Sequence, residues 1–106
     1  MISFRFTIND SFLKYTTHPI TIPKTQVEYK KMEQEGFEQG DLTIIFPKGE
    51  RFRGHIYYGV SGYGPYYQIR SRTDQDLPKY LSRGDKFIVI LYKDKRNRYS
   101  IMEYRD

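Results

Sequence analysis

The chain has 106 residues, a net charge of +5 and no cysteine, and this length predicts one domain, residues 1–106, with its own hydrophobic core. The lack of cysteine excludes disulfides and thiolate metal sites, and two histidines are too few for a zinc site without carboxylate ligands. The longest apolar run, residues 87–91, is far shorter than the roughly 20 residues of a membrane-spanning helix. We therefore expect a cytoplasmic protein that uses no membrane, metal or cofactor, and the charge and 17% aromatic content favour a nucleic-acid partner.

The first third of the chain predicts two strands and a helix. Residues 2–8 alternate apolar and polar side chains, the period of two that buries one face of a sheet, and residues 20–24 form a shorter strand. Residues 25–36 predict a helix that begins with a capping box of Thr25 and Glu28 and ends at a glycine. This helix carries most of the one acidic segment in an otherwise basic chain.

The middle third predicts three strands, of which the last two form a hairpin. Residues 41–46, 52–59 and 66–72 are rich in β-branched and aromatic side chains. Glycines and a proline fall between the second and third of these strands, so we expect the hairpin to open into a loop over residues 59–66. Tyr63 lies between two glycines of this loop and is expected to be exposed at its tip.

The last third predicts a short helix and a closing hairpin. Asp76 as a cap and Pro78 in the first turn predict a helix over residues 74–84. Residues 85–94 and 98–104 form two strands joined by a basic turn that we expect to be solvated. Seven short strands and two short helices predict a mainly β fold, a seven-stranded open pseudobarrel that leaves few exposed sheet edges.

Two runs of the sequence carry a resemblance to a known family. They read FTINDSFLKYTTHPITIPK, residues 6–24, and YYQIRSRTDQDLPKYLSRGDKFIVILY, residues 66–92. Their order and spacing resemble the B3-like DNA-binding domains that serve as effector domains in the restriction endonucleases EcoRII and BfiI. The resemblance implies a domain without catalytic residues that binds double-stranded DNA in the major groove, beside a catalytic nuclease domain on the same parent chain.

The resemblance also implies two arms that grip the DNA, residues 10–19 and residues 59–66. The candidate DNA-binding residues lie in these arms and on the strands beside them: Lys14, Tyr15, Thr16, Thr17, His18, Lys24, Arg51, Arg53, Ser61, Tyr63, Arg70 and Arg72. Arg70 and Arg72 are two residues apart on a strand and point to one face, where an arginine fork can pair with guanine O6 and N7.

Three further expectations concern single residues among these candidates. His18 precedes a proline in a polar loop, so we expect a DNA contact rather than a core histidine. Lys24 and Arg51 flank the predicted sheet and are expected to contact phosphates.

Two other functions fit the same residues. Arg53, His55 and Tyr57 alternate on one strand face, as the acid, base and phosphate-binding groups of a metal-independent, toxin-like endoribonuclease would. Alternatively, the tyrosines would stack the bases of a single-stranded nucleic acid on an OB-type barrel. Incubation with duplex DNA and with RNA distinguishes the three functions. Duplex binding without cleavage supports the DNA-binding effector domain, RNA cleavage supports the endoribonuclease, and preferential single-strand binding supports the OB-type barrel.

Overall fold

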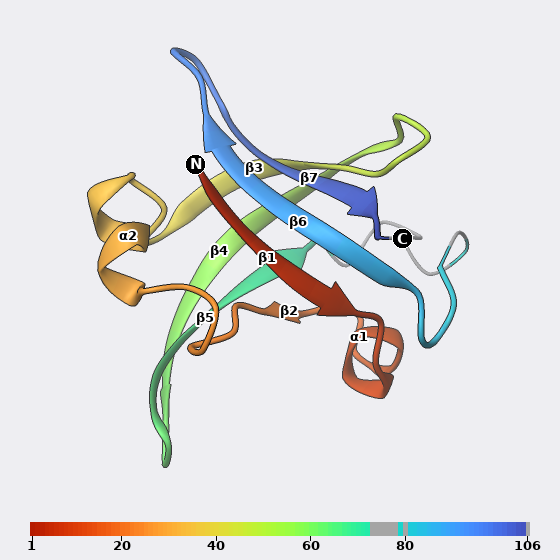
Figure 1. Ribbon diagram of the computed structural model, residues 1–106, viewed down its shortest axis with the longest axis horizontal. Helices are drawn as coiled ribbons and strands as arrows, with labels where there is room; N and C mark the ends of the chain where they lie inside the picture. Colours follow the sequence, from red (N-terminus) through yellow and green to blue (C-terminus); the bar gives the residue numbers. More distant parts are fainter. Residues whose placement is uncertain (73–78, 80, 106) are drawn as a thin grey trace.

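A computed structural model describes residues 1–72, 79 and 81–105, and within them seven strands form one nearly closed mixed sheet (Figure 1). The strands are β1 (Ile2–Thr7), β2 (Ile20–Thr21), β3 (Gly40–Ile45), β4 (Arg51–Ser61), β5 (Gly64–Ser71), β6 (Lys86–Lys93) and β7 (Arg98–Tyr104). Two short helices accompany them in this part of the chain, α1 (Asp10–Lys14) and α2 (Tyr29–Gln34). The predicted mainly β, seven-stranded pseudobarrel is therefore confirmed.

The strand order around the sheet is β1-β6-β7-β3-β4-β5-β2. Neighbouring strands are antiparallel except β3 and β7, which are parallel. At the β1 edge the side chain of Gln26 forms a hydrogen bond of the kind that a neighbouring strand would form. Its Oε1 accepts from the backbone N–H of Arg5 at 2.8 Å. This contact satisfies one of the edge groups that would otherwise be open to pairing with another chain.

The core follows from the alternation along each strand. In β1 the buried residues are Ile2, Phe4 and Phe6, and the residues between them are exposed. The two helices extend this core, since Phe12 of α1 and Met32 of α2 are completely buried. The helix α1 begins after Asn9, whose side-chain oxygen accepts from the backbone N–H of Phe12 at 2.9 Å and satisfies one of the free amides of the first turn.

The acidic helix is shorter than expected and starts without the predicted capping box. The backbone N–H of Val27 donates to the carbonyl of Pro23 at 3.1 Å, and this turn buries the Val27 side chain. The helix α2 can begin only after that turn, so Glu28 is its N-cap residue and no side-chain cap hydrogen bond forms. The predicted end is correct, because Gly36 has φ of +79° and terminates the helix.

The hairpin of β4 and β5 is longer than expected. Its ladder continues to the pair of Ser61 and Gly64, which leaves a two-residue turn of Gly62 and Tyr63. The expected loop over residues 59–66 is therefore wrong, because strand pairing persists through the glycines, and Gly64 alone among these four residues has a positive φ, at +101°. The hairpin projects from the barrel at the lower edge of Figure 1.

The expected helix over residues 74–84 lies largely outside the described residues. Within the described residues no helix is long and apolar enough to cross a membrane. The same residues hold no group of three histidine, aspartate or glutamate side chains that could ligate a metal ion.

The barrel should lose stability at alkaline pH because two tyrosines are partly withdrawn from water. Burial raises the pKa of both Tyr29 and Tyr67, whose rings pack edge to face with centroids 5.1 Å apart. An unfolded chain ionises these phenols near pH 10, so their contribution to stability is complete below about that pH and is lost as the pH rises through the folded pKa. Urea unfolding at about pH 8 and about pH 11 measures the loss.

Variants separate this effect from general alkaline denaturation. Tyr67→Phe and Tyr29→Phe remove one ionising group each, so each should show a smaller drop in stability between the two pH values than the wild type. An equal drop in all three proteins would contradict the assignment.

Candidate nucleic-acid interface

The outer face of β4 and β5 brings several candidate residues together. Strand register places His55 opposite Arg70 and Tyr57 opposite Gln68, with all four side chains on the face that points away from the core. Arg53 continues this face along β4. Arg53, His55 and Tyr57 therefore share one face of β4, as their alternation in the sequence indicated.

Arg70 is held in one position by two neighbours. Its guanidinium carbon lies 3.6 Å from the centroid of the Tyr57 ring, close enough for a cation–π interaction. Its Nε donates to Oε1 of Gln68 at 3.0 Å, and Nε2 of Gln68 donates to the hydroxyl of Thr21 on β2, also at 3.0 Å. Ring stacking and one hydrogen bond fix the guanidinium plane while leaving its Nη atoms for other acceptors.

Gly59 makes room for a second tyrosine beside this pair. It lies opposite Tyr66, and a Cβ at Gly59 would come within 2.6 Å of the Tyr66 side chain and 2.8 Å of the Tyr57 ring. The two rings are 6.0 Å apart. The glycine therefore serves ring packing within a strand, rather than the loop flexibility that the sequence suggested.

Replacing Gly59 with alanine should displace the Tyr66 ring and separate it from Tyr57. Loss of one aromatic pair predicts a fall in unfolding free energy of about 0.5–1.5 kcal/mol, together with a change in the near-ultraviolet circular dichroism of the tyrosines. Gly62→Ala is the matched control in the same hairpin, because a Cβ there meets no atom within 4 Å. Equal stability of the two variants would contradict the role given to Gly59.

A polar groove separates the first arm from β5. It has a volume of about 370 Å³ and is lined by hydroxyl, amide and guanidinium groups of Asn9, Ser11, Tyr15, Thr17, Thr21, Gln68 and Arg70, together with Pro19. In Figure 1, α1 and the tip of the β4–β5 hairpin lie at the lower side of the barrel, with β2 between them. Two of the candidate DNA-binding residues in the first arm, Tyr15 and Thr17, thus share one groove with Arg70.

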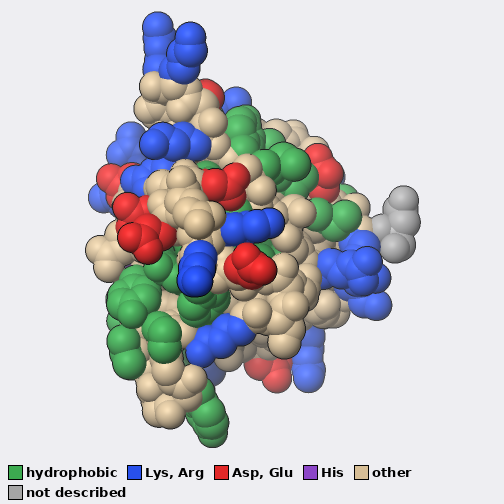
Figure 2. Space-filling view, turned by 60° about the vertical axis from the view of Figure 1, so that its left-hand side comes forward, with side chains coloured by type: hydrophobic (Ala, Val, Ile, Leu, Met, Phe, Trp, Pro, Cys, Tyr) green, Lys and Arg blue, Asp and Glu red, His purple; other side chains and the backbone are tan. Residues whose placement is uncertain are grey.

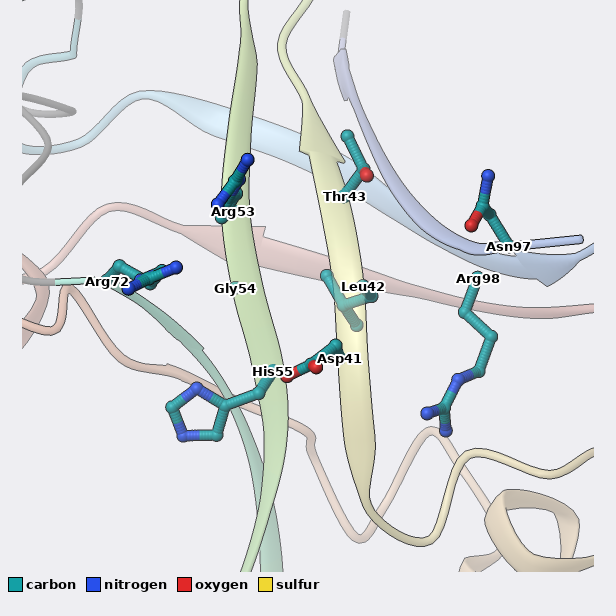
Figure 3. A pocket seen from close by; sticks show the side chains of 9 residues that line it. All are labelled: Asp41, Leu42, Thr43, Arg53, Gly54, His55, Arg72, Asn97 and Arg98. Atoms are coloured by element: carbon teal, nitrogen blue, oxygen red, sulfur yellow. The ribbon is translucent and has the colours of Figure 1, made fainter.

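A second cavity, the arginine pocket, lies farther along the sheet (Figure 3). It has a volume of about 580 Å³ and is lined by Asp41, Leu42, Thr43, Arg53, Gly54, His55, Arg72, Asn97 and Arg98. The register of β3 and β4 places Asp41 directly opposite His55. Arg98 points toward the α2 side in Figure 3, where its Nη1 donates to the carbonyls of Gly36 and Gln39 at 2.9 and 2.8 Å, so it supports the fold.

The hairpin tip is tied to the turn between β2 and α2. Nζ of Lys24 donates to the carbonyl of Tyr63 at 3.1 Å. Within the tip the backbone N–H of Tyr63 donates to the Ser61 hydroxyl at 3.2 Å. The Tyr63 side chain is 96% exposed, as expected. Lys24 and Ser61 therefore hold the tip in place, while Tyr63 is presented to solvent.

His18 is buried, so the expectation that it is not a core histidine is wrong. Its side chain is only 8% exposed, its ring packs on Phe12 with centroids 5.3 Å apart, and its Nδ1 lies 2.7 Å from the Phe12 carbonyl, to which it donates. His18 also has φ of 44°. The turn after α1 folds this ring back onto the core because its hydrogen bond satisfies a carbonyl at the end of a short helix.

The remaining candidates lie in three places. Lys14 and Thr16 are exposed near the groove, with Nζ of Lys14 5.7 Å from the Tyr15 ring. Arg51 is exposed at the start of β4, and Arg53 and Arg72 line the arginine pocket rather than the groove. Arg72 lies just beyond the end of β5, two residues after Arg70 and on the same face. The two arginines nevertheless line different cavities, because Arg70 lines the polar groove and Arg72 lines the arginine pocket.

Sequence reasoning missed several polar residues of the groove. Ser11 lies in the first arm and Asn9 directly before it, and Gln68 and Thr21 come from paired strands. A signal existed for Gln68, because it alternates with Tyr66 and Arg70 on one strand face. Thr21 carried no such signal, since its place depends on the pairing of β2 with β5.

No protein-family model matches the chain, and no curated protein matches its sequence significantly.

Proposed function

We propose that this protein binds double-stranded DNA through the polar groove and the adjacent outer face of β4 and β5. The observation that carries the proposal is the groove itself, where hydroxyls and an amide surround the fixed guanidinium of Arg70. Arginine forks and amide groups are the side chains that read base edges in the major groove of DNA. The net charge of +5 supplies the long-range attraction to phosphates.

Two projections flank this surface, which favours a duplex over a flexible strand. The α1 segment lies on one side and the β4–β5 tip on the other, and the tip is stiffened by Lys24 and by a two-residue turn. A rigid duplex can contact both projections and the sheet between them. The finer form of the proposal is a B3-like effector domain of a restriction endonuclease or related defence protein, with the nuclease on another part of the parent chain.

Selection from randomised duplexes, followed by titration of the enriched sequence, tests the proposal. We expect one short enriched sequence that binds more tightly than random duplex and than single strands of the same sequence, with no cleavage of either. Enrichment of no sequence, combined with equal binding of duplex and single strand, would reject duplex recognition and favour the single-strand alternative.

The arginine pocket favours a second function, metal-independent RNA cleavage. His55 lies opposite Asp41, a carboxylate that could orient its imidazole, and Arg53 lines the same pocket. In this reaction His55 accepts the proton of a ribose 2′-hydroxyl, whose oxygen attacks the adjacent phosphorus. The bond from phosphorus to the 5′-oxygen breaks, and the 5′-oxygen takes a proton from water and leaves as a hydroxyl. Incubation with RNA and excess chelator tests it, because cleavage must disappear in His55→Ala.

Arg51 should contribute to affinity without contributing to sequence preference. It is exposed at the start of β4 and lines neither the polar groove nor the arginine pocket, so Arg51→Ala should weaken binding to preferred and random duplexes equally. The slope of log K against log salt should fall by about one if one phosphate contact is lost. Salt titrations on both duplexes measure this.

Lys30→Ala is the control for Arg51→Ala, because it removes the same charge from α2 on another side of the barrel. It should leave the slope nearly unchanged. A loss confined to the preferred duplex in Arg51→Ala would instead place Arg51 at a base edge.

A further inference from the structure

A third cavity lies on the α2 side of the barrel and differs in chemistry from the DNA-binding surface. It has a volume of about 330 Å³ and is lined by Glu33, Glu38, Gln39, Tyr58 and Tyr67. Tyr58 and Tyr67 are opposite each other in the β4–β5 ladder and face the side of that ladder opposite to Tyr57 and Arg70. Figure 2 brings the α2 side forward and shows acidic side chains just above a group of hydrophobic ones at the left.

The two tyrosines form the aromatic wall of this cavity. Their ring centroids are 5.2 Å apart with the planes inclined by 55°. Tyr58 is 39% exposed, whereas Tyr67 is only 8% exposed. Within the described residues the hydroxyl of Tyr67 forms no hydrogen bond although the residue is more than nine-tenths buried, so an acceptor of hydrogen bonds is left open in the cavity wall.

The two carboxylates give this aromatic cavity a negative potential. Both glutamates line the cavity together with Tyr67. Burial is the main cause that raises the pKa of Tyr67, and nearby negative charges, those of Glu33 and Glu38 among them, raise it further. Neither glutamate forms an ion pair within the described part of the chain. Two unpaired carboxylates thus stand beside two aromatic rings on a protein whose net charge is positive.

We propose that this cavity binds a primary alkylammonium group, the chemistry of a lysine side chain. The ammonium would lie near the face of Tyr58. Its three N–H groups would donate to the two carboxylates and to the free Tyr67 hydroxyl, so that all three donors are used. A quaternary ammonium has no N–H to donate, and an anion is repelled by both glutamates. The site is independent of the proposed DNA binding, since it lies across the β4–β5 ladder from Arg70.

Titration followed by amide NMR shifts tests the site with three probes. They are a blocked lysine, the same molecule with its side chain acetylated, and spermidine. We expect shifts around Tyr58, Glu38 and Tyr67 with the blocked lysine, at a Kd on the order of 1 mM, and none with the acetylated form. If spermidine binds as tightly as the blocked lysine or more tightly, the natural ligand is a free polyamine. If spermidine binds more weakly, the ammonium comes from a lysine of a polypeptide. Shifts with neither amine would overturn the proposal.

Three variants assign the binding to this cavity. Glu38→Gln removes one charge, Tyr67→Phe removes only the hydroxyl, and Tyr58→Leu removes the exposed ring. Each should raise the Kd for the blocked lysine on the order of fivefold, while Glu103→Gln, an exposed carboxylate on β7, should leave it unchanged. Equal effects of Glu38→Gln and Glu103→Gln would show general charge attraction and overturn the site. Fold integrity is checked in the same NMR spectra.

Discussion

Replacing Arg70 with alanine should weaken binding to the preferred duplex by about 1–3 kcal/mol and binding to random duplex much less. The physical reason lies in the geometry of the side chain, because the Tyr57 ring and the Gln68 amide fix the guanidinium plane before DNA arrives. A preorganised fork loses little rotamer entropy when it pairs with guanine. Titration of both proteins against both duplexes at constant salt gives the two differences.

Two variants distinguish base recognition by the Arg70 guanidinium from simple charge attraction to phosphates. Arg70→Lys keeps the charge but loses the fork, so it should behave like alanine on the preferred duplex and like wild type on random duplex. Tyr57→Leu keeps the arginine but removes its stacking partner, so a smaller loss of preference is expected. Equal losses on both duplexes for Arg70→Ala, with a shallower salt dependence, would make Arg70 a phosphate contact and leave base reading to the two projections.

Replacing His18 with alanine should destabilise the fold by about 2–4 kcal/mol. The substitution removes a ring packed on Phe12 and leaves the Phe12 carbonyl without its hydrogen-bond donor in a buried place. Histidine also tolerates the left-handed φ of 44° at this position better than most residues with a Cβ. Urea unfolding with an unchanged m-value measures the loss as a lower midpoint.

Two exposed residues of the same projections serve as controls for His18→Ala. Thr16→Ala changes a neighbour in the first arm, and Tyr63→Ala changes the hairpin tip, where the side chain is almost fully exposed. Both should stay within about 0.5 kcal/mol of wild type. A His18→Ala protein as stable as these controls would show that the ring does not support the fold, and would return His18 to the candidates for DNA contact.

The features that depend on a few neighbouring residues were predicted correctly from the sequence alone. Alternation in residues 2–8 identified β1 and its buried face, and the glycine after α2 marked the end of that helix. The exposure of Tyr63 followed from its glycine neighbours. These features are local because side-chain direction in a strand has a period of two and a positive φ favours glycine.

Some local signals were present but were outweighed by others. Asn9 had the spacing of an N-cap to Phe12, yet the first arm was expected to be a loop, and α1 forms there. Glycines 59, 62 and 64 predicted a broken hairpin, but cross-strand pairing continued because the Tyr66 ring fills the space above Gly59. Thr25 and Glu28 predicted a capping box, and burial of Val27 delayed the helix instead.

Which distant residues lie together depends on the tertiary structure and could not be predicted from the sequence. The position of Asp41 opposite His55 depends on the register of β3 with β4, and the groove that joins Tyr15 to Arg70 depends on β2 pairing with β5. The burial of His18 depends on a core that seven strands assemble together. These arrangements bring together residues far apart in the chain, such as Tyr15 and Arg70, which are 55 positions apart and line one groove. They reflect strand pairing and loop closure over the whole chain, which no short pattern encodes.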